Sequence, residues 1–352
     1  MNQSLYDLVT AANVVAYWLE KNVNAQPYFG ETLFPSKRVV GIKLDWIKGA
    51  KNQPVGLRLA AYDTKAIRRD RQGIEEYQTK MPFFKESKYI DEDMRQKLNT
   101  LIGSSNNKEL VNRILREIFN DEIELIEAAA IKLERMRMEV LTNGTITLAE
   151  NGQSYVYDFG IPVEQKMTAT VSWSDPDADI IKEINDIKDA MKAKGVTLTR
   201  AICNNQIVKY LEKNKNIKNQ IYVLAGGSIA SINGARALSY LEDETGITFF
   251  VYDNVYVDEQ GTAHKYIADD TVVFIPDGTL GYTNMGTTPE ESDLMASGIA
   301  SVRVLNNGVA VTEYKTVDPV NVEVKVSMVG MPSFERANEV VILDTDATTS
   351  AG

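Results

Sequence analysis

A single uninterrupted apolar stripe constrains this chain most. Between about residues 108 and 141, apolar side chains recur every three or four positions, as expected for one face of an α-helix. The stripe consists of Phe119, Ile123, Ile126, Ala130, Leu133, Met136 and Val140. Asn106 is a suitable N-cap, and Asn143-Gly144 is a suitable stop. At about 1.5 Å per residue, the helix is a rod roughly 50 Å long, so it should lie across a sheet or span a domain.

The segment from Arg38 to about Ile90 is, in contrast, poor in apolar residues. Two stretches, "VVGIKLDWIKG" and "PVGLRLAAYDT", alternate as the strands of a hairpin do, and the highly charged "KAIRRDRQGIEEYQTK" (65–80) follows them. An isolated two-stranded ribbon is marginally stable at best in water. Because ordering each residue costs roughly 1 kcal/mol or more, we expect this segment to gain its stability from contacts outside itself.

The rest of the chain mixes helices and strands. A helix is predicted for residues 1–25, and strands are predicted for "TITLA", "QSYVYDFGI" and "TATVSW" after the long helix. A helix capped by Ser174 or Asp175 and ending at Gly195 comes next. Helices and strands then alternate over 196–295 as in an α/β unit, and the last 50 or so residues are rich in strands. The predicted fold class is therefore α+β.

The composition excludes several classes of protein. The chain has 352 residues, 44% of them hydrophobic and 25% charged, which is ordinary for a globular protein. Its net charge of −11 argues against affinity for nucleic acid, which requires clustered Lys and Arg. No stretch approaches the ~18 consecutive apolar residues of a membrane span. A lone cysteine, Cys203, rules out an internal disulfide framework and suits a reducing cytosol.

No group of residues predicts catalysis, a cofactor or a metal. His264 has no visible partner for general base chemistry and is assigned to a surface turn. Cys203 is expected to be a buried small hydrophobe. The "DPDAD" motif (175–179) begins like a calcium loop but has Ile180 where glycine is required, so helix capping explains it better. "DFG" (158–160) lacks the other kinase motifs, and "LAGGSIASINGA" (224–235) fits no phosphate-binding pattern.

Five segments in order resemble a known family. They are "NAQPYFGETLFPSKR", "MPFFKES", the long helix with its Asn-Gly stop, "VSWSDPDADIIKEINDIKDAMKAKG" and "DPVNVEVKVSMVGMPSFERANEVVILD". Each is short and degenerate, but their order and spacing over nearly the whole chain resemble the major capsid proteins of tailed bacteriophages, the lambda-like capsid protein E family.

The resemblance implies the HK97-type capsid fold and a division into domains. Residues 1–37 would form an N-terminal arm and residues 38–95 an extended loop. Residues 96–195 together with 309–352 would form a discontinuous peripheral domain that contains the long spine helix. Residues 196–308 would form an axial α/β domain.

The implied function is that of a non-enzymatic major capsid protein, which self-assembles into the icosahedral head shell around double-stranded DNA. Its partners would be other copies of itself in hexamers and pentamers, a separate scaffolding protein, a portal and, optionally, a decoration protein. Contacts with packaged DNA would not be sequence-specific, and no membrane would be involved. The protein would assemble in the host bacterial cytoplasm and end in the virion. No cofactor is expected.

One hypothesis concerns contacts between subunits. We expect Phe83 and Phe84 to pack at the base of the loop or on an adjacent subunit, and the alternative is burial in the chain's own peripheral domain. The charged residues of the loop would form ion pairs between subunits: Arg68, Arg69, Arg71, Glu75 and Glu76.

Two other functions stay open from the sequence. One is an encapsulin-type nanocompartment shell of the same fold, which would hold cargo proteins in place of DNA. The other is an α/β enzyme in residues 196–308 with a β-rich accessory domain, which the missing catalytic residues disfavour.

Overall fold

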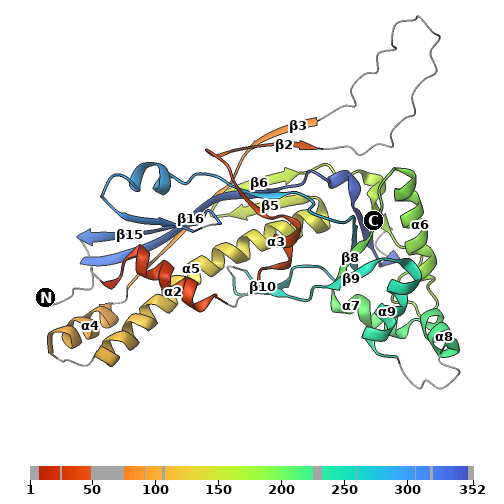
Figure 1. Cartoon of the computed structure of the whole chain (residues 1–352), viewed down its shortest axis with the longest axis horizontal. Coiled ribbons are helices and arrows are strands. Elements are labelled where there is room, and N and C mark those ends of the chain that lie inside the picture. The colour runs from red at the N-terminus through yellow and green to blue at the C-terminus, as the bar shows by residue number, and fades with distance from the viewer. Residues whose placement is uncertain are drawn as a thin grey trace, which may run out of the picture. The chain divides into compact units, whose positions relative to one another are not determined.

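The computed structural model describes residues 8–23, 26–48, 75–90, 92–104, 108–224, 232–258, 260–305, 307–317 and 320–347 (Figure 1). Contacts divide the chain into two compact units. Unit 1 comprises Met1–Asp45, Gln78–Arg137 and Tyr282–Ser333, and unit 2 comprises Trp46–Tyr77, Met138–Gly281 and Phe334–Gly352. Each unit is therefore assembled from segments that are distant in the sequence.

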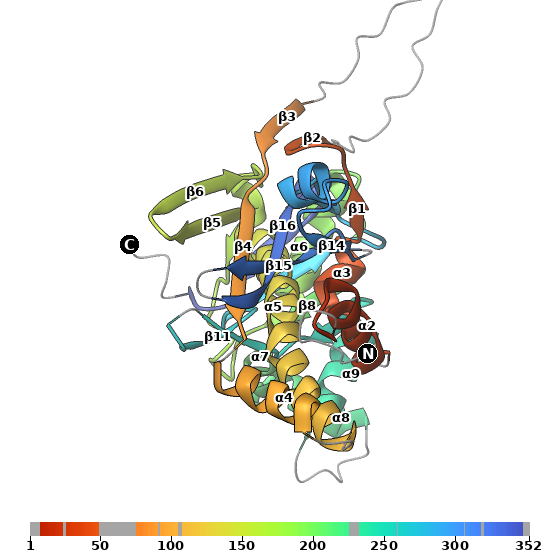
Figure 2. The same ribbon diagram turned by 90° about the vertical axis from the view of Figure 1, so that its left-hand side faces the viewer.

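Unit 1 is built on a six-stranded sheet. Its order is β1 (Ser36–Arg38), β13 (Tyr282–Met285), β16 (Val320–Ser333), β15 (Ala310–Val317) and β14 (Ser301–Val304), and β4 (Phe83–Tyr89) pairs with β16 off this path. The helices of the unit are α2 (Ala11–Lys21), α3 (Phe29–Leu33), α4 (Glu92–Ser104), the larger part of α5 (Lys108–Asn143) and the π-helical turn η2 (Glu290–Leu294). A two-stranded ribbon of β2 (Lys43–Lys48) and β3 (Glu75–Lys80) lies between β1 and β4 in the sequence, and the division assigns its residues 43–45 and 78–80 to unit 1 and its other described residues to unit 2. Figure 2 shows β4 alongside β16 and α5.

The long helix predicted for about 108–141 is confirmed as α5 (Lys108–Asn143). Its predicted stripe is buried at Ile123, Ile126, Leu133, Met136 and Val140, and half-buried at Phe119 and Ala130. The predicted stop is also confirmed. Gly144 has a φ of +75°, and a Cβ there would lie 2.8 Å from Ile161 Cδ1, so both conformation and packing require glycine. The predicted N-cap, Asn106, lies outside the described residues.

A buried polar network fastens α3 and β13 to α5. Glu134 Oε1 accepts a hydrogen bond from Gly30 N (2.9 Å), and Arg137 Nε donates to Thr283 Oγ1 (2.8 Å). Thr283 Oγ1 in turn donates to Phe34 O at 2.7 Å. Glu134 and Arg137 are also an ion pair at 3.5 Å, one turn apart on the helix. Since buried polar groups need partners, this network holds α3 and β13 at one position along α5.

Unit 2 contains a five-stranded sheet in the order β7 (Lys166–Thr168), β17 (Val341–Asp344), β12 (Thr271–Ile275), β8 (Arg200–Cys203) and β9 (Thr248–Val251). Its helices are α6 (Ile180–Ala193), α7 (Asn205–Lys213), α8 (Lys215–Leu224) and α9 (Gly234–Thr245), with 3₁₀ turns η1 (Val163–Gln165) and η3 (Ala337–Glu339). Two hairpins complete it: β5 (Thr145–Glu150) with β6 (Gln153–Asp158), and β10 (Val255–Val257) with β11 (Ala263–Lys265).

One hydrophobic core unites the sheet and helices of unit 2. It includes Trp173 and Ile184 before residue 196, Phe274 within 196–308, and Leu343 near the C-terminus. The core therefore extends beyond the range expected for an axial domain. The domain limits 1–37, 38–95, 96–195 plus 309–352, and 196–308 stay a prediction.

Several local predictions need correction. Asp179 caps α6 by accepting from Lys182 N, so neither Ser174 nor Asp175 is the cap. In "TATVSW" only Thr168 is in a strand, because β7 covers Lys166–Thr168. The predicted strand at 54–64 lies outside the described residues, and among the described residues β2 pairs with β3.

The single histidine, His264, and the single cysteine, Cys203, both lie in environments that do not suggest a catalytic role. His264 is exposed as predicted, but it lies within β11 and has a partner, since its Nε2 is 2.6 Å from Asp258 Oδ2. The prediction for Cys203 is confirmed: it is fully buried, and burial raises the pKa of its thiol to about 12. A thiol with that pKa is protonated and unreactive at neutral pH.

The carboxyl group of Glu122 on α5 is buried, since the residue is only 1% exposed, and its Oε2 has no hydrogen-bond partner among the described residues. Burial raises the pKa of Glu122 from 4.5 to about 8, with Lys88 lowering it and Asp121 raising it further. Between these two pKa values the folded chain holds a proton that the unfolded chain has lost. The free energy of unfolding should therefore decrease as the pH rises through this interval.

Replacing this carboxyl by an amide should remove that dependence. From about pH 5 to about pH 8, the wild-type free energy of unfolding should fall by about 3 to 4 kcal/mol more than that of Glu122→Gln, since between the two pKa values each pH unit corresponds to about 1.4 kcal/mol. Urea unfolding at the two pH values measures the difference. Equal changes in the two proteins would show that Glu122 titrates normally.

Candidate functional site at the ribbon base

The ribbon base is the part of unit 1 from which the β2–β3 ribbon emerges, and we define it as residues 38–42 and 81–90. Residues 38–42 form the outgoing limb and residues 81–90 the returning limb. Met81 N donates to Ile42 O at 2.9 Å, so the two limbs are bonded to each other. Two of the residues that the sequence predicted to contact other subunits, Phe83 and Phe84, lie in the ribbon base.

Backbone hydrogen bonds hold the outgoing limb against the segment that follows β13. Strand β1 pairs in parallel with β13, and Val39 N continues the pairing by donating to Met285 O at 2.8 Å. Gly41, with a φ of +87°, donates from its N to Thr287 Oγ1 (3.3 Å) and accepts from Thr287 N (2.9 Å). A left-handed residue is thus fixed where the chain turns into the ribbon.

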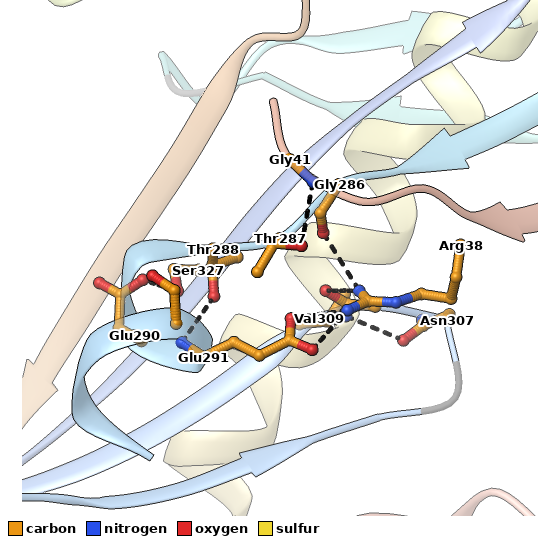
Figure 3. Close-up of polar contacts among 12 residues, drawn as sticks. Arg38, Gly41, Gly286, Thr287, Thr288, Glu290, Glu291, Asn307, Val309 and Ser327 are labelled. Carbon is orange, nitrogen blue, oxygen red and sulfur yellow. Dashed lines mark hydrogen bonds and ion pairs between the residues drawn. The ribbon is translucent and has the colours of Figure 1, made fainter. Parts of the chain in front are cut away.

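The side chain of Arg38 adds a second set of contacts (Figure 3). Its Nη2 is 2.6 Å from both carboxylate oxygens of Glu291, and its Nη1 donates to the carbonyls of Gly286 (3.2 Å) and Gly308 (3.5 Å). Such charge-assisted contacts, with several acceptors around one planar guanidinium, fix geometry as well as contribute energy. Arg38 therefore joins β1 to three other points of unit 1.

The neighbouring carboxylate, Glu290, faces β16 (Figure 3). It is buried, its Oε1 lies 2.7 Å from Lys325 Nζ, and its Oε2 accepts from Ser327 Oγ at 2.9 Å. Burial by itself would raise the pKa of Glu290, but the hydrogen bonds from Lys325, its own backbone and Ser327 outweigh it and lower the pKa. Glu290 is therefore ionised at neutral pH.

Two glycines allow these elements to approach closely. A Cβ on Gly286 would lie 2.4 Å from Gly41 O, and a Cβ on Gly308 would lie 2.6 Å from Arg38 Nη1. Neither position can hold a larger residue without a shift of its neighbours. The ribbon base is thus close-packed around Arg38 and Gly41.

The two phenylalanines of "MPFFKES" lie in the returning limb and have different environments. β4 pairs antiparallel with β16, with Phe83 opposite Val329 and Phe84 opposite Met328. Phe84 is half-buried, and the ammonium of Lys132 on α5 lies 5.6 Å from its ring centre. Phe83 is 42% exposed, with Lys85 as its cation partner at 5.7 Å. Successive side chains of a strand face opposite sides, so Phe84 faces α5 and Phe83 faces away from it.

The described structure does not test the charged residues that were predicted to contact other subunits. Arg68, Arg69 and Arg71 lie outside the described residues. Glu75 and Glu76 belong to β3. Their role between subunits stays a prediction.

The Arg38–Glu291 pair was not predicted, because it joins positions 253 residues apart. One local signal was readable in "TTPEES", because a threonine three residues before a glutamate is typical of a helix start. Thr288 Oγ1 does accept from Glu291 N at 3.3 Å. That signal predicts the turn η2 but not the arginine that its glutamate binds.

The described residues contain no group of His, Cys, Asp and Glu able to hold a metal ion. No helix among the described parts of the chain is long and apolar enough to cross a membrane. A cavity of about 560 Å³ lies along α5, lined by polar and charged residues: Glu109, Asn112, Arg113, Arg116, Glu117 and Asn120.

Comparisons with known proteins agree with this architecture. Residues 10–345 match the family described as phage major capsid protein E. No curated protein matches the chain.

Three solved structures are similar in fold. A protein described as a prophage capsid protein of E. coli CFT073 has 16% identity and a TM-score of 0.58, covering 94% of this chain and 98% of that one. A phage-related protein from Bordetella bronchiseptica RB50 has 11% identity and a TM-score of 0.55, with coverages of 94% and 96%. The capsid of cyanophage A-1(L) has 12% identity and a TM-score of 0.50, with coverages of 91% and 92%.

These similarities confirm the predicted α+β class and the HK97-type capsid fold. The family match spans nearly all of the chain and confirms the resemblance found in the sequence. The chain therefore belongs to the phage major capsid protein E family and is a subunit of a phage head shell.

Proposed function

We propose that copies of this chain contact one another through the ribbon and its base as they form the pentamers and hexamers of an icosahedral shell. The observation that supports this is a contrast at the ribbon base. Its backbone and Arg38 are held by many bonds, yet Val40 is 98% exposed and Phe83 is 42% exposed. Apolar side chains displayed by a rigid segment suit an interface, because little ordering cost is left to pay on binding.

The edge of the sheet in unit 1 offers a second contact. Among the described residues β4 pairs with β16 alone, so its outer edge has no strand partner. Exposed strand edges are sites for added strands unless charges protect them, and β4 carries Lys85, Glu86 and Lys88. Tyr89 and Val320, both exposed, lie on adjacent strands near this edge. A neighbouring copy with complementary charge would cover them.

The remaining partners follow from the same role. We propose a separate scaffolding protein, a portal and an optional decoration protein, assembly in the host bacterial cytoplasm, and no enzymatic activity. Packaged DNA would touch the inner wall without sequence-specific contacts, since the net charge of −11 gives the chain little electrostatic attraction for phosphate. The phage family match favours this role over an encapsulin-type nanocompartment.

Electron microscopy of the purified chain tests the proposed function. Produced with its scaffolding protein, the wild-type chain should form closed particles of uniform size with a single protein layer. The sample without the scaffold serves as the comparison for uniformity. Monomers or small open oligomers under both conditions, at concentrations where shells of similar proteins form, would refute the proposal.

The two phenylalanines provide a matched pair for testing the interface. Phe83→Ser should abolish or strongly reduce particle formation with little effect on protomer stability, because Phe83 faces away from α5. Phe84→Ser should instead lower protomer stability by about 1 to 3 kcal/mol, as expected for loss of a half-buried aromatic side chain. Particle yield and thermal unfolding distinguish the two effects. If Phe83→Ser assembles normally, Phe83 is not an interface residue.

A further inference from the structure

We propose that residues 285–291 act as a clip that fixes the direction in which the ribbon leaves unit 1, and that the Arg38–Glu291 pair closes this clip. The inference rests on the proposed function, because a direction matters only if the ribbon has to meet another copy. It assigns a positioning role to Arg38 and Glu291, two residues that need not touch the neighbouring subunit themselves.

The clip holds the outgoing limb through consecutive residues. Met285 accepts from Val39, Thr287 exchanges two hydrogen bonds with Gly41, and Glu291 binds Arg38. Gly286 contributes its carbonyl to Arg38. Three of the five residues of the limb, Arg38, Val39 and Gly41, are therefore bonded to this one short segment, and Figure 3 shows the contacts of Arg38 and Gly41.

The clip residues 285–291 are also bonded to β16, the strand that pairs with β4 of the returning limb. Gly286 N donates to Val329 O at 2.8 Å, and Glu290 binds Lys325 and Ser327 of β16. β16 pairs in turn with β4 over seven residue pairs, from Phe83–Val329 to Tyr89–Glu323. The adjacent carboxylates Glu290 and Glu291 thus connect to different limbs, Glu290 through β16 and Glu291 directly.

The position of the pair indicates a geometric role more than a stabilising one. The side chains of Arg38 and Glu291 are 37% and 24% exposed, and ion pairs that water can reach contribute little to stability. Their geometry is nonetheless demanding, because one guanidinium reaches a carboxylate and two carbonyls. Losing the pair should therefore loosen the outgoing limb without unfolding unit 1.

A small change of angle at the base has a large effect at the far end of the ribbon. β2 has six residues and so is about 20 Å long at roughly 3.3 Å per residue. A rotation of about 15° at the base would move its far end by roughly 5 Å, which exceeds the ~4 Å within which side chains make contact. Precise docking on another subunit therefore requires the base to be fixed.

Hydrogen exchange and particle closure test the clip with three variants. Glu291→Gln keeps the side-chain shape but removes the charge, and Arg38→Lys keeps the charge but cannot reach the carboxylate and both carbonyls together. Asp186→Asn is the matched control, because it removes the exposed Lys182–Asp186 pair, which has the same 2.6 Å separation on α6.

In separated protomers, the amides of Val39 and Gly41 should exchange about tenfold faster in both clip variants than in wild type or in Asp186→Asn. With the scaffolding protein, the clip variants should form irregular or open particles, while thermal unfolding stays within a few degrees of wild type. Wild-type exchange rates at these amides, or normal closed shells in either clip variant, would overturn the inference.

A fourth variant keeps the test decisive if Glu291→Gln does not fold. Thr287→Val removes the hydroxyl that accepts from Gly41 N and leaves the ion pair in place. It should speed exchange at Gly41 and produce irregular particles, and unchanged exchange with closed shells would contradict the clip. Because exchange is measured on protomers, failure of the wild-type chain to form shells would refute the proposed function separately.

Discussion

The main physical constraint on this structure is that contacts must offset the entropy cost of ordering a polar ribbon. Ordering its residues costs roughly 1 kcal/mol or more each, and few of its own side chains can offset this. The described part of the ribbon contributes Leu44 and Trp46, both buried, and the Trp46 ring lies 5.5 Å from that of Phe159. The first strand thus has an anchor within the chain, while the side chains of Val40 and Phe83 are exposed. We infer that neighbouring copies supply the rest.

In unit 1, polar contacts determine where α3, β13 and the ribbon base lie, whereas apolar side chains make up most of the buried residues. The apolar stripe of α5 does not by itself fix which turn of the helix lies against its neighbours, because each turn of the stripe has similar side chains. Glu134, Arg137 and Thr283 remove that freedom, since their hydrogen bonds form at only one register. Arg38 and Glu291 do the same for the ribbon base at a more exposed position. Buried ionic groups are costly to desolvate, so we regard their contribution as one of precise geometry for assembly.

Periodic elements of the fold were predictable from the sequence, and long-range polar contacts were not. The stripe of α5 and its stop at Gly144 are local patterns with a single physical explanation. The cap of α6 was misplaced because Ser174, Asp175 and Asp179 are all good capping residues, and only packing selects Asp179. The clip at Arg38 and Glu291 had no local signal for its pairing. The exposed Phe83 and half-buried Phe84 illustrate the same limit, since adjacent identical residues differ only by the face of a strand.

If the ribbon gains its stability from adjoining copies, the backbone amides of β2 and β3 should be better protected from hydrogen exchange in the shell than in a separate protomer. The amides of residues 43–48 and 75–80 would be measured in separated protomers and in assembled particles of the wild-type chain. We predict exchange that is at least about tenfold slower in the particle, beyond any change in strands of the unit 2 sheet, which serve as the internal reference. Equal protection of β2 and β3 in the two states would show that the ribbon is complete within one protomer and would contradict the account.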